Sequence, residues 1–118
     1  MSDTVSWNVH MSVREGQLND ARELMTEMVE STRGEAGTLG YEWFLGAGGT
    51  VCHLNERYAD SDAAMVHLGT FGAKFVERFL ECFEPTGLHV YGEPSDDVQA
   101  VLDNFGAVYL GTFGGFSH

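Results

Sequence analysis

The sequence predicts an α+β fold: an antiparallel sheet on the ferredoxin-like split βαβ plan, with an extra helix and strand at the C-terminal end. Two observations support this prediction. Stretches of β-type alternation and of helical spacing follow one another in the order β-α-β-β-α-α-β, and then α-β. The second and third β-type stretches are joined by a short glycine-rich turn, as in an antiparallel hairpin. The 118 residues suffice for one domain, 1–118, of which 93–118 form the extension.

The first strand is expected over residues 6–13, where apolar and polar side chains alternate. The apolar set should meet the helices, and it consists of Trp7, Val9, Met11 and Val13. Asn8 and His10 then belong to the opposite face of the sheet. We expect that face to border a pocket, and a solvated polar face is the alternative.

An amphipathic helix follows, because apolar residues recur at helical spacing between Leu18 and Thr32. Gly34 is suited to end this helix. The hairpin then consists of the β-type runs 39–45 and 51–58, which the turn 46–50 connects.

Two helical stretches come after the hairpin. Ser61 is the expected N-cap of the first, over 61–71, and the second covers 73–83. Gly69 and Gly72 are expected to mark a bend between the two helices. Pro85 is expected to end the second helix.

A short strand over 87–91 and the extension complete the chain. Ser95 should cap a final helix, and Gly106 should end it. The apolar residues at 98, 101, 102 and 105 repeat at helical spacing, which has a purpose only if that face is buried. We therefore expect the extension, which ends in a strand over 107–113, to be an integral part of the fold.

The charge balance disfavours two kinds of partner. Six basic and eighteen acidic residues give a formal net charge of −12. Such a field repels nucleic acid and anionic membranes. The chain has no apolar run of about 18 residues and no signal-peptide pattern, so we expect a soluble, cytoplasmic protein. Cys52 and Cys82 are expected to be buried, reduced thiols, and no pattern predicts a bound metal.

Glu56 and His67 are the polar residues that stand out near the hairpin. In the third strand, Glu56 shares a face with Cys52, Leu54 and Tyr58. A buried carboxylate in this apolar row needs a partner. Its candidates are Arg57 or Arg78, in a structural ion pair, and His67, in a functional one. His67 lies on the following helix, where it is either a packing residue or a catalytic one.

Aromatic residues are frequent in the predicted interior, and they include Tyr41, Trp43, Phe44, Tyr58, Phe71, Phe75 and Phe79. Each is expected to belong to the core. A planar apolar ligand would nevertheless need such walls, together with a few polar groups that orient it. The glycines at 46, 48 and 49 occupy a hairpin tip, so they do not form a dinucleotide-binding loop.

Over residues 5–92 the chain resembles the antibiotic biosynthesis monooxygenase superfamily. The matching residues form the pattern Glu35-x-Gly37-x-x-x-Tyr41, Glu56-x-Tyr58-x-Asp60, then His67, Phe75, Phe79 and Phe83. This resemblance implies a dimeric α/β barrel, in which the open sheets of two chains pack against each other as a homodimer. The C-terminal extension would be well placed to extend this pairing across the subunit boundary.

The resemblance also implies an activity. It is cofactor-independent monooxygenation of a quinol-like or polyphenolic aromatic substrate by O₂, since such substrates, once deprotonated, react with oxygen directly. His67 or His10 would be the catalytic base. The implied substrate-binding residues are Asn8, Trp43, Glu56, Tyr58 and Phe71. No cofactor or metal is expected.

Two alternatives remain open from the sequence. The superfamily also contains haem-binding and haem-degrading monooxygenases, which would use Asn8, an axial His67 and a Trp at position 57 or 58. This chain has Arg57 and Tyr58 instead. The other alternative is a non-catalytic module on the same fold that binds a small ligand or has a stress-related role. It stays open because a fold does not determine a function.

Overall fold

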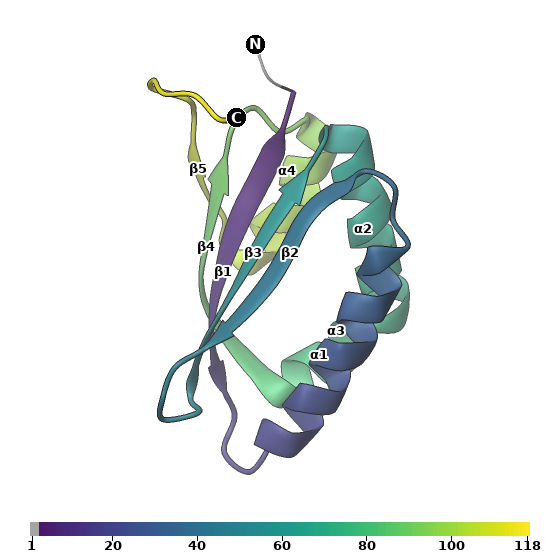
Figure 1. Ribbon diagram of the computed structural model, residues 1–118, viewed down its shortest axis with the longest axis vertical. Helices are drawn as coiled ribbons and strands as arrows, with labels where there is room; N and C mark the ends of the chain where they lie inside the picture. Colours follow the sequence, from purple (N-terminus) through teal and green to yellow (C-terminus); the bar gives the residue numbers. More distant parts are fainter. Residues whose placement is uncertain (1–2) are drawn as a thin grey trace.

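The computed structural model describes residues 3–118 and has one five-stranded sheet in the order β2-β3-β1-β4-β5. The strands are β1 Val5–Val13, β2 Thr38–Leu45, β3 Val51–Tyr58, β4 Phe83–Tyr91 and β5 Val108–Leu110. The helices are α1 Leu18–Arg33, α2 Ser61–Lys74, α3 Val76–Cys82 and α4 Asp96–Leu102, followed by a 3₁₀ turn, η1, over Asp103–Phe105. Figure 1 shows the helices layered on one side of the sheet, with the other side open. The α+β prediction is confirmed.

The sheet pairing follows the split βαβ plan. Strand β1 lies between β3 and β4 and pairs with both in antiparallel fashion, and β2 pairs with β3 in the hairpin. Alternation along β1 sends Trp7 and Met11 towards the helices, where they are 3% and 1% exposed. On β3 the same face carries Leu54, Glu56 and Tyr58, all buried. The predicted helix-facing set is therefore confirmed.

The helix boundaries after the hairpin differ from the prediction. Asp60, not Ser61, is the N-cap of α2, because its carboxylate accepts a hydrogen bond from the backbone N–H of Ala63 at 2.8 Å. Helix α2 continues through Gly69 and Gly72 to Lys74, and Phe75 separates it from α3, which begins at Val76. The bend predicted at the two glycines therefore falls a few residues later.

Pro85 has a different role from the one predicted. Helix α3 ends at Cys82, and the chain enters β4 at once, so Pro85 is a strand residue opposite Met11. The register of β4 against β1 shifts between His10 and Met11. A proline, which has no N–H to donate, is tolerated at such an irregularity.

The C-terminal extension packs on its own chain. Ser95 caps α4, since its hydroxyl accepts from the N–H of Val98 at 3.3 Å. Gly106 ends η1 with a positive φ of 72°, a conformation that suits glycine. Strand β5 is shorter than expected and pairs in parallel with β4 of the same chain, as an edge strand of the sheet. Val98 and Leu102 are 0% and 3% exposed.

No helix within residues 3–118 has the length and apolar character needed to cross a membrane.

Candidate functional site

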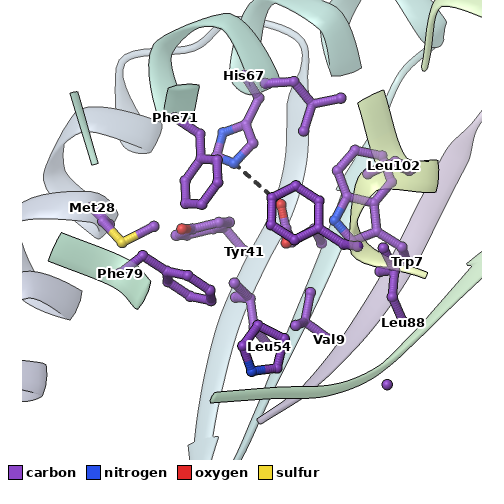
Figure 2. Close-up of a pocket in the computed structure, with 15 residues that line it drawn as sticks. Trp7, Val9, Met28, Tyr41, Leu54, His67, Phe71, Phe79, Leu88 and Leu102 are labelled. Carbon is purple, nitrogen blue, oxygen red and sulfur yellow. Dashed lines mark ion pairs between the residues drawn. The ribbon is translucent and has the colours of Figure 1, made fainter. Parts of the chain in front are cut away.

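A pocket lies between the helix-facing side of the sheet and the helices that cover it (Figure 2). The space between protein atoms there is about 550 Å³, part of it open to solvent. Most of its lining is apolar, and the apolar side chains include Trp7, Val9, Met28, Leu54, Phe71 and Phe79. The polar side chains in the lining are Tyr41, Glu56 and His67. An apolar cavity with a few converging polar groups is the usual form of a small-molecule site.

Strand register brings the polar groups of the pocket together. Glu56 of β3 stands opposite Trp7 of β1 on one side and Tyr41 of β2 on the other, and all three face the helices. His67 lies on α2 and is 6% exposed. The rings of Tyr41 and Tyr58 flank the imidazole, each with its centroid 5.3 Å away.

His67 is held between two carboxylates. Its Nε2 lies 3.2 Å from Oε1 of Glu56, and its Nδ1 lies 3.0 Å from Oε1 of Glu35. The Tyr58 hydroxyl donates to the same Oε1 of Glu56 at 2.5 Å, and the Thr38 hydroxyl donates to Glu35 at 2.8 Å. Both ring nitrogens of His67 therefore face acceptors, which is the arrangement that a protonated imidazolium satisfies.

The electrostatics of this network favour a charged ring. Burial alone would lower the pKa of His67, but hydrogen bonds and charge from Glu56 and Glu35 outweigh it and raise that pKa above 6.5. Burial and the Glu56 charge raise the pKa of Tyr58 and of Tyr41 far above the ordinary value, so both phenols stay protonated. Of the alternatives for Glu56, His67 is its partner, whereas Arg78 pairs with Glu27.

The network is equipped for proton transfer. Tyr58 and His67 both contact Oε1 of Glu56, which leaves Oε2 out of these two contacts. Glu56 lines the pocket, so its carboxylate can meet a ligand directly. His67 also lines the pocket, but both of its nitrogens contact carboxylates.

Not every residue predicted for the site is part of the pocket. Phe71 lines it, together with Glu56 and His67. Tyr58 is 0% exposed, and its hydroxyl donates a hydrogen bond to Glu56. Trp43 packs against Phe83, with ring centroids 5.6 Å apart, and lines a separate hollow beside α1.

Asn8 and His10 lie on the open face of the sheet, as the alternation predicts. Asn8 borders a hollow there, as expected of this face, whereas the pocket with His67 lies on the other face. Asn8 donates to Asn55 there. His10 stacks on His53 with centroids 3.9 Å apart and has His89 beside it at 5.6 Å. Burial, followed by the charges of these two neighbours, lowers the pKa of His10. Within one chain, His10 and His67 cannot act on the same ligand.

The reasoning from sequence missed two parts of the site. Glu35 was part of the matching pattern, yet nothing in its local sequence indicated that it meets His67, 32 residues later. Leu102 and Phe105 of the extension also line the pocket. Their helical spacing predicted burial, but not the cavity against which they are buried.

Comparisons with known proteins agree on the fold. The family model described as antibiotic biosynthesis monooxygenase matches residues 4–84. The structure of MupZ from Pseudomonas fluorescens is similar over 99% of this chain and 96% of its own, at 20% identity and a TM-score of 0.87. Rv0793 from Mycobacterium tuberculosis is similar over 79% and 97%, at 23% identity and a TM-score of 0.67.

A third similar structure is a mutant of SnoaB, a cofactor-independent oxygenase from Streptomyces nogalater. It covers 80% of this chain and 96% of its own, at 10% identity and a TM-score of 0.67. No curated protein matches the chain. Because the family model spans more than half of the sequence, this chain belongs to the antibiotic biosynthesis monooxygenase family.

Proposed function

We propose that the chain is a cofactor-independent monooxygenase that oxidises a quinol-like or polyphenolic aromatic with O₂. The observation that carries this proposal is the buried Glu35–His67–Glu56 network at the wall of an apolar, aromatic-lined pocket. Family membership and the similarity to SnoaB, an oxygenase that needs no cofactor, add to its support.

The chain's part in the reaction is to remove a proton in a dry site. Glu56 takes the proton of a ligand hydroxyl on Oε2, and the phenolate that forms passes one electron to O₂. Superoxide and the ligand radical combine at a ring carbon that bears a hydrogen, and the peroxide that forms takes the proton back from Glu56. The resulting hydroperoxide loses water to leave a carbonyl. One oxygen atom thus enters the product and the other leaves as water.

The other residues set the conditions for that step. Protonated His67 stands beside Glu56 and balances its charge, and Glu35 fixes the other side of the ring. This assignment moves the base from His67 to Glu56, because both nitrogens of His67 already contact carboxylates. Trp7, Phe71 and Phe79 provide flat apolar walls for a ring system.

A second candidate function is an acid–base reaction without oxygen, such as an isomerisation or an elimination. The Glu56–His67 pair favours this candidate. Such a reaction requires only a carboxylate that accepts a proton and an imidazolium beside it, and the pair provides both. The structural similarity to MupZ over nearly the whole chain, with β5 and α4 included, is compatible with either reaction.

Haem does not fit the pocket. An axial histidine needs a free ring nitrogen, whereas both nitrogens of His67 contact carboxylates. Asn8 lies on the other face of the sheet, and the Trp expected near the end of β3 is replaced by Arg57 and Tyr58.

We also propose that the protein is a homodimer that packs through the open sheet face. Large apolar side chains are exposed there, among them Phe44 at 51%, Tyr91 at 43% and Val108 at 52%. Strand alternation places only two acidic strand residues, Glu42 and Glu84, on this face, although the chain carries a charge of −12. A second copy can therefore approach here with little repulsion.

The proposed reaction is tested by oxygen uptake with a panel of quinols and hydroxylated naphthalenes and anthracenes, corrected for uncatalysed oxidation. Glu56→Gln should lower the rate by about 10²-fold or more. Glu30→Gln, which changes an exposed carboxylate paired only with Arg33, should keep the natural rate. Ligand turnover without oxygen uptake would favour the second candidate, and binding without turnover would indicate a non-catalytic module.

A further inference from the structure

The C-terminal extension supplies one wall of the pocket. Leu102 from the end of α4 and Phe105 from η1 both line it. The ring of Phe105 meets that of Phe71 edge to face, with centroids 6.3 Å apart. In Figure 2, Leu102 lies on the side of the pocket where Trp7 and Leu88 stand. Segments from the two ends of the chain thus enclose the same cavity.

This wall is anchored at several points. The backbone N–H of Ser95 donates to the Ser61 hydroxyl at 2.9 Å, which joins the start of α4 to the start of α2. Beyond η1, the Tyr109 hydroxyl lies 2.6 Å from Oδ1 of Asp103. Val98, one turn before Leu102, is fully buried. A wall fixed in this way restricts the shape of a ligand, because it cannot move aside without breaking these contacts.

The extension lies beyond the part of the chain that the family model matches. The family model ends at residue 84. Rv0793 and SnoaB are covered over 97% and 96% of their own chains by alignments that leave about a fifth of this chain unmatched. The family model therefore does not include α4 and η1, whereas the MupZ structure matches nearly all of this chain.

We propose that the α4–η1 segment determines which ligands the pocket accepts, with Phe105 limiting the size of the fused ring system that fits. This inference rests on the proposed function only in that the pocket binds an aromatic ligand. Phe105 is partly exposed, so it stands at the edge of the cavity rather than deep in the core. Its ring occupies the space into which a longer ligand would extend, and a pocket discriminates by such steric limits.

The test compares the binding of 1-naphthol and 1-anthrol, which differ by one fused ring, by isothermal titration calorimetry. In the natural protein we expect 1-naphthol to bind more tightly. Phe105→Ala should improve the Kd ratio in favour of 1-anthrol by about tenfold, a change within the range of pocket discrimination. Phe105→Leu, which keeps apolar packing at this position, should give a smaller change in the same direction. Phe116→Ala removes a ring that is 85% exposed and should leave the ratio unchanged.

The outcomes separate this inference from the proposed function. If both phenols bind and neither Phe105 variant alters their ratio while remaining folded, the extension does not set specificity, although the pocket remains an aromatic site. If neither phenol binds to the natural protein, both the aromatic site and this inference are overturned. A changed ratio without oxygen uptake would support the inference and count against the oxygenase.

Discussion

Nδ1 of His67 lies 3.0 Å from Oε1 of Glu35 and 3.3 Å from its Oε2, so one carboxylate holds one edge of the imidazole. The other edge meets Glu56 at 3.2 Å. The buried titratable and charged groups around this ring come from the α1–β2 connection, β2 and β3: Glu35, Tyr41, Glu56 and Tyr58. Helix α4 and turn η1 face the same cavity with apolar side chains only. The charge state of His67 therefore depends chiefly on two carboxylates.

Removing the Glu35 charge should lower the pKa of His67, because Glu35 is one of the two anions that favour the protonated ring. In Glu35→Gln, we expect the ¹⁵N NMR titration of His67 to move to lower pH, with the pH–rate profile of any turnover moving alongside it. Glu30→Gln is the matched control. An unchanged His67 titration in Glu35→Gln would show that Glu56 alone sets the charge.

Removing the imidazole should destabilise the fold. His67→Gln leaves Glu35 and Glu56 buried without their shared cation, and breaking a buried charge pair typically costs about 3–5 kcal/mol. Urea denaturation of the variant and the natural protein at neutral pH measures the difference. His118→Gln, in the exposed C-terminal tail, is the control. A decrease in the free energy of unfolding of less than about 1 kcal/mol would contradict this prediction, because it is the size expected for an exposed ion pair.

The stability that His67 provides should depend on pH with a definite sign. Its pKa is raised in the folded protein above the ordinary 6.5, so the charged ring stabilises the fold fully below that pH. The contribution is lost as the pH rises through the folded pKa. The free energy of unfolding of the natural protein, minus that of His67→Gln, should therefore fall as the pH is raised above 6.5. A difference that grows over this range would contradict the assignment.

Cutting the chain after Gly92 should lower the melting temperature markedly, because it removes Val98 and Leu102, which are almost completely buried. Cutting after Gly111 removes only the tail with Phe113 and Phe116, both exposed, and should leave the melting temperature nearly unchanged. Differential scanning calorimetry of the two truncations compares them directly. Equal melting temperatures for both truncations and the full chain would mean that the extension is not integral.

The protein should be a homodimer in solution, with a mass by light scattering of about twice 12.9 kDa. Phe44→Glu places a charge on the open sheet face and should weaken the dimer. Val66→Glu changes a side chain that is 60% exposed on the helical layer and should not. A monomer mass for the natural protein at micromolar concentration would exclude the dimer, and equal effects of the two variants would place the interface elsewhere.

Several features of the molecule could be predicted from the sequence because they depend on local periodicity. Alternation along β1 and β3 determines which side chains face the helices, since a strand repeats every two residues. It places Trp7 and Glu56 on one face, and Asn8 and His10 on the other. Ser95 and Gly106 act locally at the helix end where each stands. The bend lies at Phe75 rather than at Gly69 or Gly72, because a glycine inside a helix costs only about 1 kcal/mol and does not by itself end the helix.

Which distant residues meet depends on how the helices pack on the sheet. Glu35 reaches His67 because α2 crosses the sheet above the start of β2, and no local pattern encodes that crossing. The pocket with His67 forms where the helices do not fill the space above the sheet. Asn8 and His10 lie on the opposite face and therefore do not line it. Phe105 became a pocket residue for the same reason. Composition and periodicity specify the face that a residue presents, whereas packing determines the neighbour that it finds there.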